Sequence, residues 1–190
     1  MLQKLNIDAT RPVVVFASYR TGSTAFCDYI SHKHQLINFD EAFHWDFPWR
    51  TADFIRQSLT TNFVIKIMPD QYQNYKSIID FLIEECSCNL IRLTRNNFVE
   101  QVASWYVAST SDNWHNTGHD NNHYSVPIVH KQIIGCTDFI EKQNLALEKI
   151  NFNFSNEIEY SELGSIDSKY RVYNKPTNYA TLLEEIRKVI

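Results

Sequence analysis

A run of six apolar or small residues, Val13–Ser18, passes directly into Tyr19–Thr24 and then into a stretch of helical character. The run is continuous rather than alternating, which is typical of a strand buried on both faces in a parallel sheet. A strand that leads through a tight turn into a helix leaves backbone N–H groups unpaired at the positive end of the helix dipole. The segment therefore predicts an anion-binding turn after the first strand.

The rest of the chain alternates short β-branched runs with stretches of helical period. Four further strands are expected at Leu36–Phe39, Phe63–Met68, Asn89–Thr94 and Glu157–Tyr160. Helices are expected at Thr24–Lys33, Tyr75–Glu85, Phe98–Ser109, Lys131–Ile150 and Tyr179–Ile190. This order predicts an α/β fold: one domain over residues 1–190, with a mostly parallel five-stranded sheet, helices on both faces and a P-loop-like first turn. Such sheets bind ligands where their strands end, which here means just after Ser18, Met68, Thr94 and Tyr160.

The composition limits the class of protein. The 190 residues are 44% hydrophobic and 21% charged, enough for one globular core. A net charge of −4 disfavours a general binder of nucleic acid or of membrane surfaces. The N-terminal region has no long apolar run that would predict a signal peptide or membrane anchor, and the cysteines lack zinc-type spacing. We therefore expect a cytoplasmic protein with reduced thiols and a locally built anion site.

Within the turn, Gly22 allows a close bend, Thr21, Ser23 and Thr24 offer hydroxyl groups, and Arg20 adds a positive charge. The common nucleotide loops do not match. A dinucleotide-binding loop needs further glycines, and a Walker A loop needs a lysine directly before its serine. What remains is a shorter loop of the form basic-[ST]-G-[ST]-[ST]. The alternative is an ordinary turn with a Ser or Thr helix cap.

A second pair of residues follows the fourth predicted strand. Arg95 comes at the carboxyl end of that strand, and Ser104 lies about two turns into the next helix. A forked guanidinium and a hydroxyl group suit a phosphate monoester. The alternative is that Arg95 pairs with a surface carboxylate and that Ser104 is an incidental helix residue.

Together the two motifs resemble the PAPS-dependent sulfotransferase family, in which the first binds the 5′-phosphosulfate of PAPS and the second its 3′-phosphate. The resemblance is closest to the small bacterial and phage-like branch typified by trehalose sulfotransferase, whose first loop also reads like SYRTGST. It extends to Ile158–Leu163, which is similar to a family strand ending in Tyr-Glu-Asp-Leu, with the tyrosine near the adenine. The resemblance implies transfer of a sulfuryl group from PAPS to a hydroxyl group of a small molecule or glycan, by in-line displacement and with PAP as product. The cofactor-binding residues it implies are Arg20, Thr21, Gly22, Ser23, Thr24, Arg95, Ser104 and Tyr160.

Three positions depart from the family pattern. The usual basic residue eight positions before the serine is Asn96 here, and Arg95 lies nine before it. Met68 stands where cytosolic members carry a histidine base in a Lys-Thr-His-x-Pro strand. An Arg-Lys-Gly motif is missing near the C-terminus, where Arg171 and Lys175 are the replacements. Met68 and Asn96 favour one alternative, a nucleotide-binding module without activity. A second alternative is a P-loop-like kinase, which the missing Walker lysine disfavours.

Sulfuryl transfer needs cations near the reacting oxygens and a base for the acceptor hydroxyl. Arg20 and Lys66 lie at strand ends and can supply the charge. Glu41 follows the second strand and resembles the glutamate proposed as the base in the bacterial branch. His44 is the competitor, because an imidazole ordinarily titrates near neutral pH. This scheme requires no metal.

The most polar stretch runs from Thr110 to Tyr124. It carries His115, His119 and His123 every four residues, which on a helix would form a metal-binding face. The Asn, Gly and Asp residues between them disfavour a helix. We therefore predict a loop over the acceptor pocket, in which Trp114 and Tyr124 can stack on a sugar or an aromatic acceptor.

Overall fold

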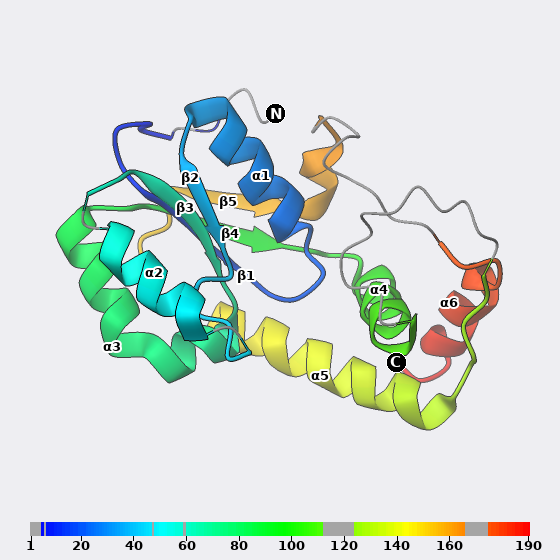
Figure 1. Cartoon of the computed structure of the whole chain (residues 1–190). Helices are drawn as coiled ribbons and strands as arrows, with labels where there is room; N and C mark the ends of the chain where they lie inside the picture. The colour runs from blue at the N-terminus through cyan, green and yellow to red at the C-terminus, as the bar shows by residue number, and fades with distance from the viewer. Residues whose placement is uncertain (1–4, 6, 47, 59, 112–123, 166–174) are drawn as a thin grey trace.

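The computed structural model describes residues 5, 7–46, 48–58, 60–111, 124–165 and 175–190. Within these residues five strands form one parallel sheet in the order β2-β3-β1-β4-β5 (Figure 1). The strands are β1 (Val13–Ala17), β2 (Ile37–Asp40), β3 (Phe63–Ile67), β4 (Asn89–Thr94) and β5 (Asn156–Glu159). After the central β1, the chain forms β2 and β3 on one side of it and later β4 and β5 on the other. The ends of β1 and β4 therefore lie where the connections diverge, which is the usual ligand position in such sheets.

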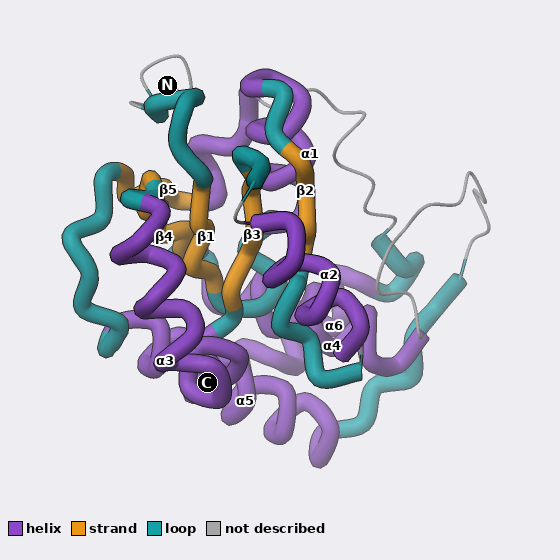
Figure 2. The backbone as a smooth tube through the Cα atoms, turned by 60° about the vertical axis from the view of Figure 1, so that its left-hand side comes forward, coloured by secondary structure: helices purple, strands orange, loops and turns teal. Residues whose placement is uncertain are grey.

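The strands alternate with α1 (Ser23–His34), α2 (Pro48–Ser58), α3 (Pro69–Cys86), α4 (Phe98–Ser111) and α5 (His130–Glu148). A 3₁₀ segment, η2 (Tyr160–Ser165), follows β5, and α6 (Tyr179–Arg187) ends the fold. Figure 2 shows β1, β2 and β3 side by side, with α3 beside the sheet and α5 beneath the lower ends of the strands. No described helix is long and apolar enough to cross a bilayer.

The side chains of β1 belong to two hydrophobic cores, one on each face of the sheet. Val13, Val15 and Ala17 belong to the cluster that includes residues of α1, whereas Val14 and Phe16 belong to the cluster with α2, α3 and the end of α5. All five are buried, because side chains alternate between two covered faces of the sheet. A third cluster joins α4, α5 and α6 beyond the sheet.

The predicted fold class is confirmed: the sheet is parallel, with helices on both faces. The predicted strands agree with the observed ones to within one residue at each end. The α3 helix starts at Pro69, earlier than the predicted start at Tyr75. Tyr75 has non-helical dihedrals (φ −119°, ψ 23°), so the helix is kinked there and its first turns do not share the helical period of the later residues. The prediction missed α2, in which Phe54 and Ser58 are the buried residues and give too little apolar period.

The ring of Phe54 anchors α2 to the sheet, so Phe54→Ala should lower the free energy of unfolding by about 3–5 kcal/mol. The side chain is fully buried and packs edge-on against Phe39, Phe43 and Phe63. Urea denaturation, monitored by circular dichroism, measures the change in the free energy of unfolding. In the control Ile55→Ala, the side chain removed is 41% exposed, so the effect should stay below about 0.5 kcal/mol. Equal losses in the two variants would contradict this packing.

Candidate functional site

The turn between β1 and α1 has an unusual backbone. Arg20 (φ 62°) and Gly22 (φ 77°) are both left-handed, and the hydroxyl of Thr21 donates a 2.9 Å hydrogen bond to the carbonyl of Ser18. Gly22 is the N-cap of α1, where no side chain caps the helix, and its carbonyl accepts the N–H of Phe26 at 3.0 Å. The alternative of a Ser- or Thr-capped turn is thus not what the structure has. That the turn binds an anion stays a prediction.

Polar side chains of α4 and α5, of which Gln101 is fully buried, form hydrogen bonds to this turn. Gln101 of α4 donates to the hydroxyl of Ser18 at 2.9 Å and to the carbonyl of Tyr19 at 2.6 Å. Asn144 of α5 donates to the Gln101 carbonyl at 3.0 Å and accepts the hydroxyl of Ser18. Neither Gln101 nor Asn144 was predicted from the sequence. The one signal for Gln101 is its place three residues before Ser104, which puts both on one helix face.

The two predicted motifs meet at the turn. Arg20 donates from Nε to the hydroxyl of Ser104 at 2.9 Å, and Arg95 donates from Nη1 to the carbonyl of Arg20 at 3.0 Å. The guanidinium of Arg95 lies 4.3 Å from the centre of the Tyr160 ring, an attractive cation–π arrangement. Tyr160 also packs on the turn, so closely that a Cβ added at Gly22 would lie 2.7 Å from its ring. The structure therefore brings these predicted cofactor-binding residues together.

Arg95 reaches the turn although it lies nine residues before Ser104. Its side chain is 10% exposed, and its Nη2 is 3.6 Å from the carboxylate of Glu100. Its Nε has no hydrogen-bond partner within the part of the chain that the structure describes. Asn96, where the sequence resemblance implied a basic residue, is exposed, and its backbone N–H donates to Glu159 at 2.9 Å. The shifted spacing thus leaves an arginine beside the turn with an unused donor.

Lys66 of β3 links the turn to the end of β2. Its side chain is 2% exposed, and its ammonium lies 2.9 Å from Asp40 and 3.0 Å from Glu41, and donates to the hydroxyl of Thr24. Burial alone would lower the pKa of Lys66, but the carboxylates of Glu41 and Asp40 outweigh burial and raise it. The ammonium therefore stays protonated at neutral pH, and its fixed positive charge lies against the first turn of α1.

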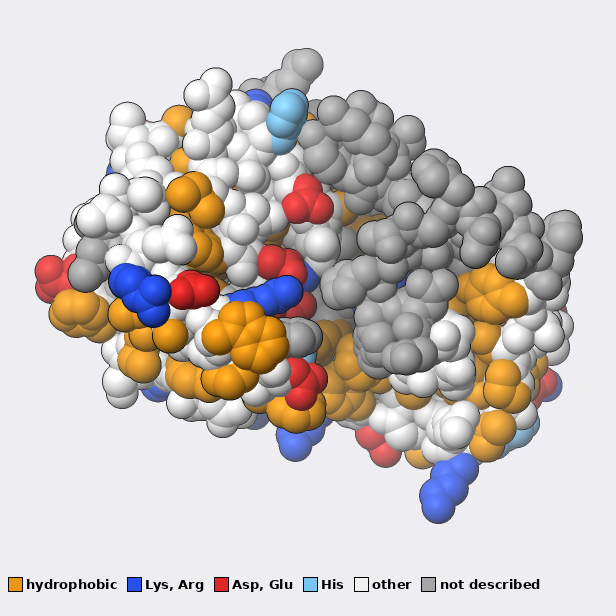
Figure 3. All heavy atoms as spheres, in the orientation of Figure 1, with side chains coloured by type: hydrophobic (Ala, Val, Ile, Leu, Met, Phe, Trp, Pro, Cys, Tyr) orange, Lys and Arg blue, Asp and Glu red, His pale blue; other side chains and the backbone are white. Residues whose placement is uncertain are grey.

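Glu41 and His44, the two candidate bases, lie together. Gln71 of α3 accepts the backbone N–H of Met68 at 3.2 Å, and this orients its amide to donate to Glu41 at 3.0 Å. His44 Nε2 is 3.9 Å from Glu41, while its Nδ1 accepts the N–H of Asp46 at 3.2 Å. In the neutral imidazole the proton is then on Nε2, facing Glu41. This arrangement favours Glu41 over His44 as the proton acceptor. Figure 3 shows acidic and basic side chains close together near the middle of the face that is turned toward the viewer in Figure 1.

Aromatic side chains border the same turn. The ring of Tyr19 lies 5.0 Å from Trp105 and 5.4 Å from Phe139, and its hydroxyl donates to Asp70 at 3.1 Å. Burial and then the nearby carboxylate of Asp70 raise the pKa of Tyr19, so its phenol stays protonated. Tyr19 is thus a fixed hydrogen-bond donor rather than a proton acceptor at this site.

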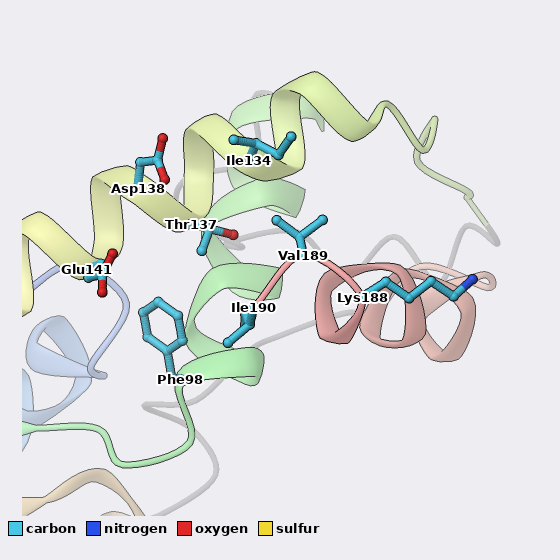
Figure 4. Close-up of a pocket in the computed structure, with 8 residues that line it drawn as sticks. All are labelled: Phe98, Ile134, Thr137, Asp138, Glu141, Lys188, Val189 and Ile190. Atoms are coloured by element: carbon cyan, nitrogen blue, oxygen red, sulfur yellow. The ribbon is translucent and has the colours of Figure 1, made fainter.

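A cavity of about 490 Å³ lies elsewhere, between α4, α5 and the last residues of the chain (Figure 4). Its lining contains none of the predicted site residues: it consists of Phe98, Ile134, Thr137, Asp138, Glu141, Lys188, Val189 and Ile190. The candidate site is therefore defined by the contacts around the turn and not by this cavity.

Some predicted features lie outside the described residues: Trp114, the three histidines His115, His119 and His123, and Arg171. Among the described residues, no group of three or more His, Cys, Asp or Glu side chains could hold a metal ion. Lys175 is described, and its ammonium lies 3.6 Å from Glu100. Tyr124 is half-buried, and its carbonyl accepts the N–H of Thr177 at 2.8 Å.

The turn geometry predicts that Gly22→Ala lowers the free energy of unfolding by about 1–3 kcal/mol. The backbone there is left-handed, and the new methyl group would meet the ring of Tyr160. Gly135→Ala makes the same change inside α5, where a Cβ meets nothing within 4 Å, and should stabilise by up to about 1 kcal/mol. Urea denaturation compares the two variants. A Gly22→Ala protein as stable as Gly135→Ala would contradict the turn described above.

The site thus has two linked halves. One is the turn with Arg20, Arg95 and Ser104, and the other is the ion-paired Lys66 and Glu41. Thr24 joins them, since it lies in the first turn of α1 and accepts a hydrogen bond from Lys66. Such an arrangement can hold an anionic group at the turn and a proton-accepting carboxylate nearby. No known family model matches the chain, and a search of curated proteins finds no significant match.

Proposed function

We propose that the protein is a PAPS-dependent sulfotransferase that moves a sulfuryl group to a hydroxyl group of a small molecule or glycan. The observation that carries the proposal is the meeting of two motifs distant in sequence. Arg20 of the turn hydrogen-bonds Ser104 of α4, and Arg95 hydrogen-bonds the turn itself. A nucleotide with phosphate groups at both its 5′ and 3′ positions needs two anion sites close together, and the meeting of these two motifs supports that assignment.

The residues fit such a nucleotide. The open N-terminus of α1, together with the hydroxyl groups of Ser23 and Thr24, suits the 5′-phosphosulfate. Arg95 has a buried Nε without a partner among the described residues, so it has a donor left for a 3′-phosphate. The proposed site also lies at the carboxyl ends of the strands, which is where parallel α/β folds usually bind their ligands.

In the proposed reaction the acceptor oxygen forms a bond to sulfur, while the bond from sulfur to the bridging phosphate oxygen breaks. Glu41 takes the acceptor's proton, and PAP leaves with the electron pair of the broken bond. Lys66 and Arg20 supply positive charge beside the turn, where negative charge develops on the leaving group. Gln71 and Lys66 each bind one oxygen of Glu41, so the carboxylate is held in a fixed orientation.

We also propose a cytoplasmic location. The four cysteines Cys27, Cys86, Cys88 and Cys136 are all free thiols in the structure. Burial raises the pKa of Cys88 to about 12 and that of Cys136 in the same direction, so their thiols are unreactive at neutral pH. Free thiols of this kind fit a reducing compartment.

Calorimetric titration tests the nucleotide assignment. PAP should bind more tightly than AMP, which lacks the 3′-phosphate, and more tightly than ATP. Arg95→Ala should weaken PAP binding on the order of 100-fold and AMP binding little, because it removes a nearly buried charge from the 3′-phosphate site. The matched control Arg56→Ala removes an exposed arginine of α2 and should change neither affinity. Tight binding of ATP without binding of PAP would contradict the assignment and favour the kinase alternative.

The base assignment has a separate test. Glu41→Gln should bind PAP like the wild type but lose transfer by a factor of about 10²–10⁴, because an amide cannot accept the proton. Transfer is measured with radiolabelled PAPS and an acceptor found by screening hydroxyl compounds. Asp53→Asn, an exposed change on α2, is the control and should keep full transfer. Full transfer by Glu41→Gln would show that another group is the base, and His44→Ala is then the next variant.

A further inference from the structure

Glu100 lies at the centre of a group of donors beside the turn. It is the third residue of α4, where its backbone N–H is capped by the side chain of Asn97 at 3.1 Å. Its carboxylate accepts the hydroxyl of Tyr179 at 2.6 Å and lies 3.6 Å from both Arg95 Nη2 and Lys175 Nζ. Arg95 lies between β4 and α4, whereas Lys175 and Tyr179 lie just before and at the start of α6, which is beside α4 (Figure 1).

Two cations and a hydroxyl group around one anion are also the donor set of a phosphate monoester. The two ionic contacts of Glu100 are loose, because 3.6 Å exceeds the roughly 2.7–2.9 Å of a charge-assisted hydrogen bond. The carboxylate is also only three-quarters buried, at 24% exposure, so it can move toward solvent. A more highly charged anion could therefore displace the Glu100 carboxylate from Arg95 and Lys175.

Arg95 does not depend on Glu100 for its position. Its Nη1 is held by the carbonyl of Arg20, and its guanidinium packs on the ring of Tyr160. When the contact with Glu100 is lost, the arginine therefore stays beside the turn, with Nη2 released from the carboxylate and with its buried Nε still lacking a hydrogen-bond partner among the described residues.

We propose that Glu100 is an internal competitor of the nucleotide's 3′-phosphate, an inference that rests on the proposed function. Its carboxylate engages Arg95 and Lys175 in the free protein and gives them up when the phosphate binds. The exchange is favourable, because a phosphate monoester carries a charge of about −1.5 to −2 near neutral pH and a carboxylate only −1. Since both anions use the same cations, Glu100 lowers the affinity for PAP and so helps the product to leave.

The variant Glu100→Gln keeps the shape of the side chain and an oxygen that can accept the hydroxyl of Tyr179, but it removes the charge. Calorimetry should show that it binds PAP about tenfold more tightly than the wild type, because no carboxylate competes for Arg95. AMP binding should not change. Lys175→Met should weaken PAP binding and leave AMP binding unchanged, because it removes a cation that the phosphate gains.

Glu148→Gln is the matched control, since Glu148 is exposed at the far end of α5 and the change in net charge is the same. It should alter neither affinity, and thermal unfolding confirms that each variant is folded. If the wild type prefers PAP to AMP and Glu100→Gln binds PAP no more tightly, or Glu148→Gln gains as much, the competitor role is wrong. A wild type that does not distinguish PAP from AMP would instead overturn the 3′-phosphate site, and this inference with it.

Discussion

The left-handed turn after β1 is the constraint on which the rest of the site depends. Arg20 and Gly22 hold backbone conformations that are unfavourable for most residues, and such strain persists only where the surroundings enforce it. Here the surroundings are Gln101 below the turn, Tyr160 against Gly22 and Arg95 on the carbonyl of Arg20. Three later segments of the chain thus fix the geometry of a loop formed near its beginning.

The turn also connects the nucleotide side of the proposed site to its catalytic side. Lys66 donates to Thr24 in the first turn of α1 and pairs with Glu41 and Asp40 at the end of β2. A buried ammonium is stable there only because two carboxylates neutralise it. The parallel sheet makes this meeting unavoidable, since β1, β2 and β3 all end at one edge. The fold therefore determines where Lys66 and its two carboxylate partners lie, and so how charge is balanced at the site.

The sequence was sufficient for the features that have a local signal. Short β-branched and apolar runs located the strands, and the single glycine in a Ser/Thr-rich segment located the turn. The helix α2 and the tertiary partners of the site had no such signal. Gln71, Gln101 and Asp40 are polar residues whose roles depend on helices or strands far away in the chain. Both Arg20 and Ser104 were predicted as cofactor-binding residues, but nothing in their sequence positions indicated that they contact each other.

The roles proposed for the turn, for Arg95 and for Glu100 all depend on where a nucleotide with phosphates at its 5′ and 3′ positions binds. A crystal structure of the protein with PAP tests this most directly. The 5′-phosphate is expected at the N-terminus of α1, on Ser23 and Thr24, and the 3′-phosphate within hydrogen-bond distance of Arg95 and Ser104. The carboxylate of Glu100 should have moved away from Arg95. PAP bound elsewhere, for example in the cavity near Ile190, would contradict the central claim.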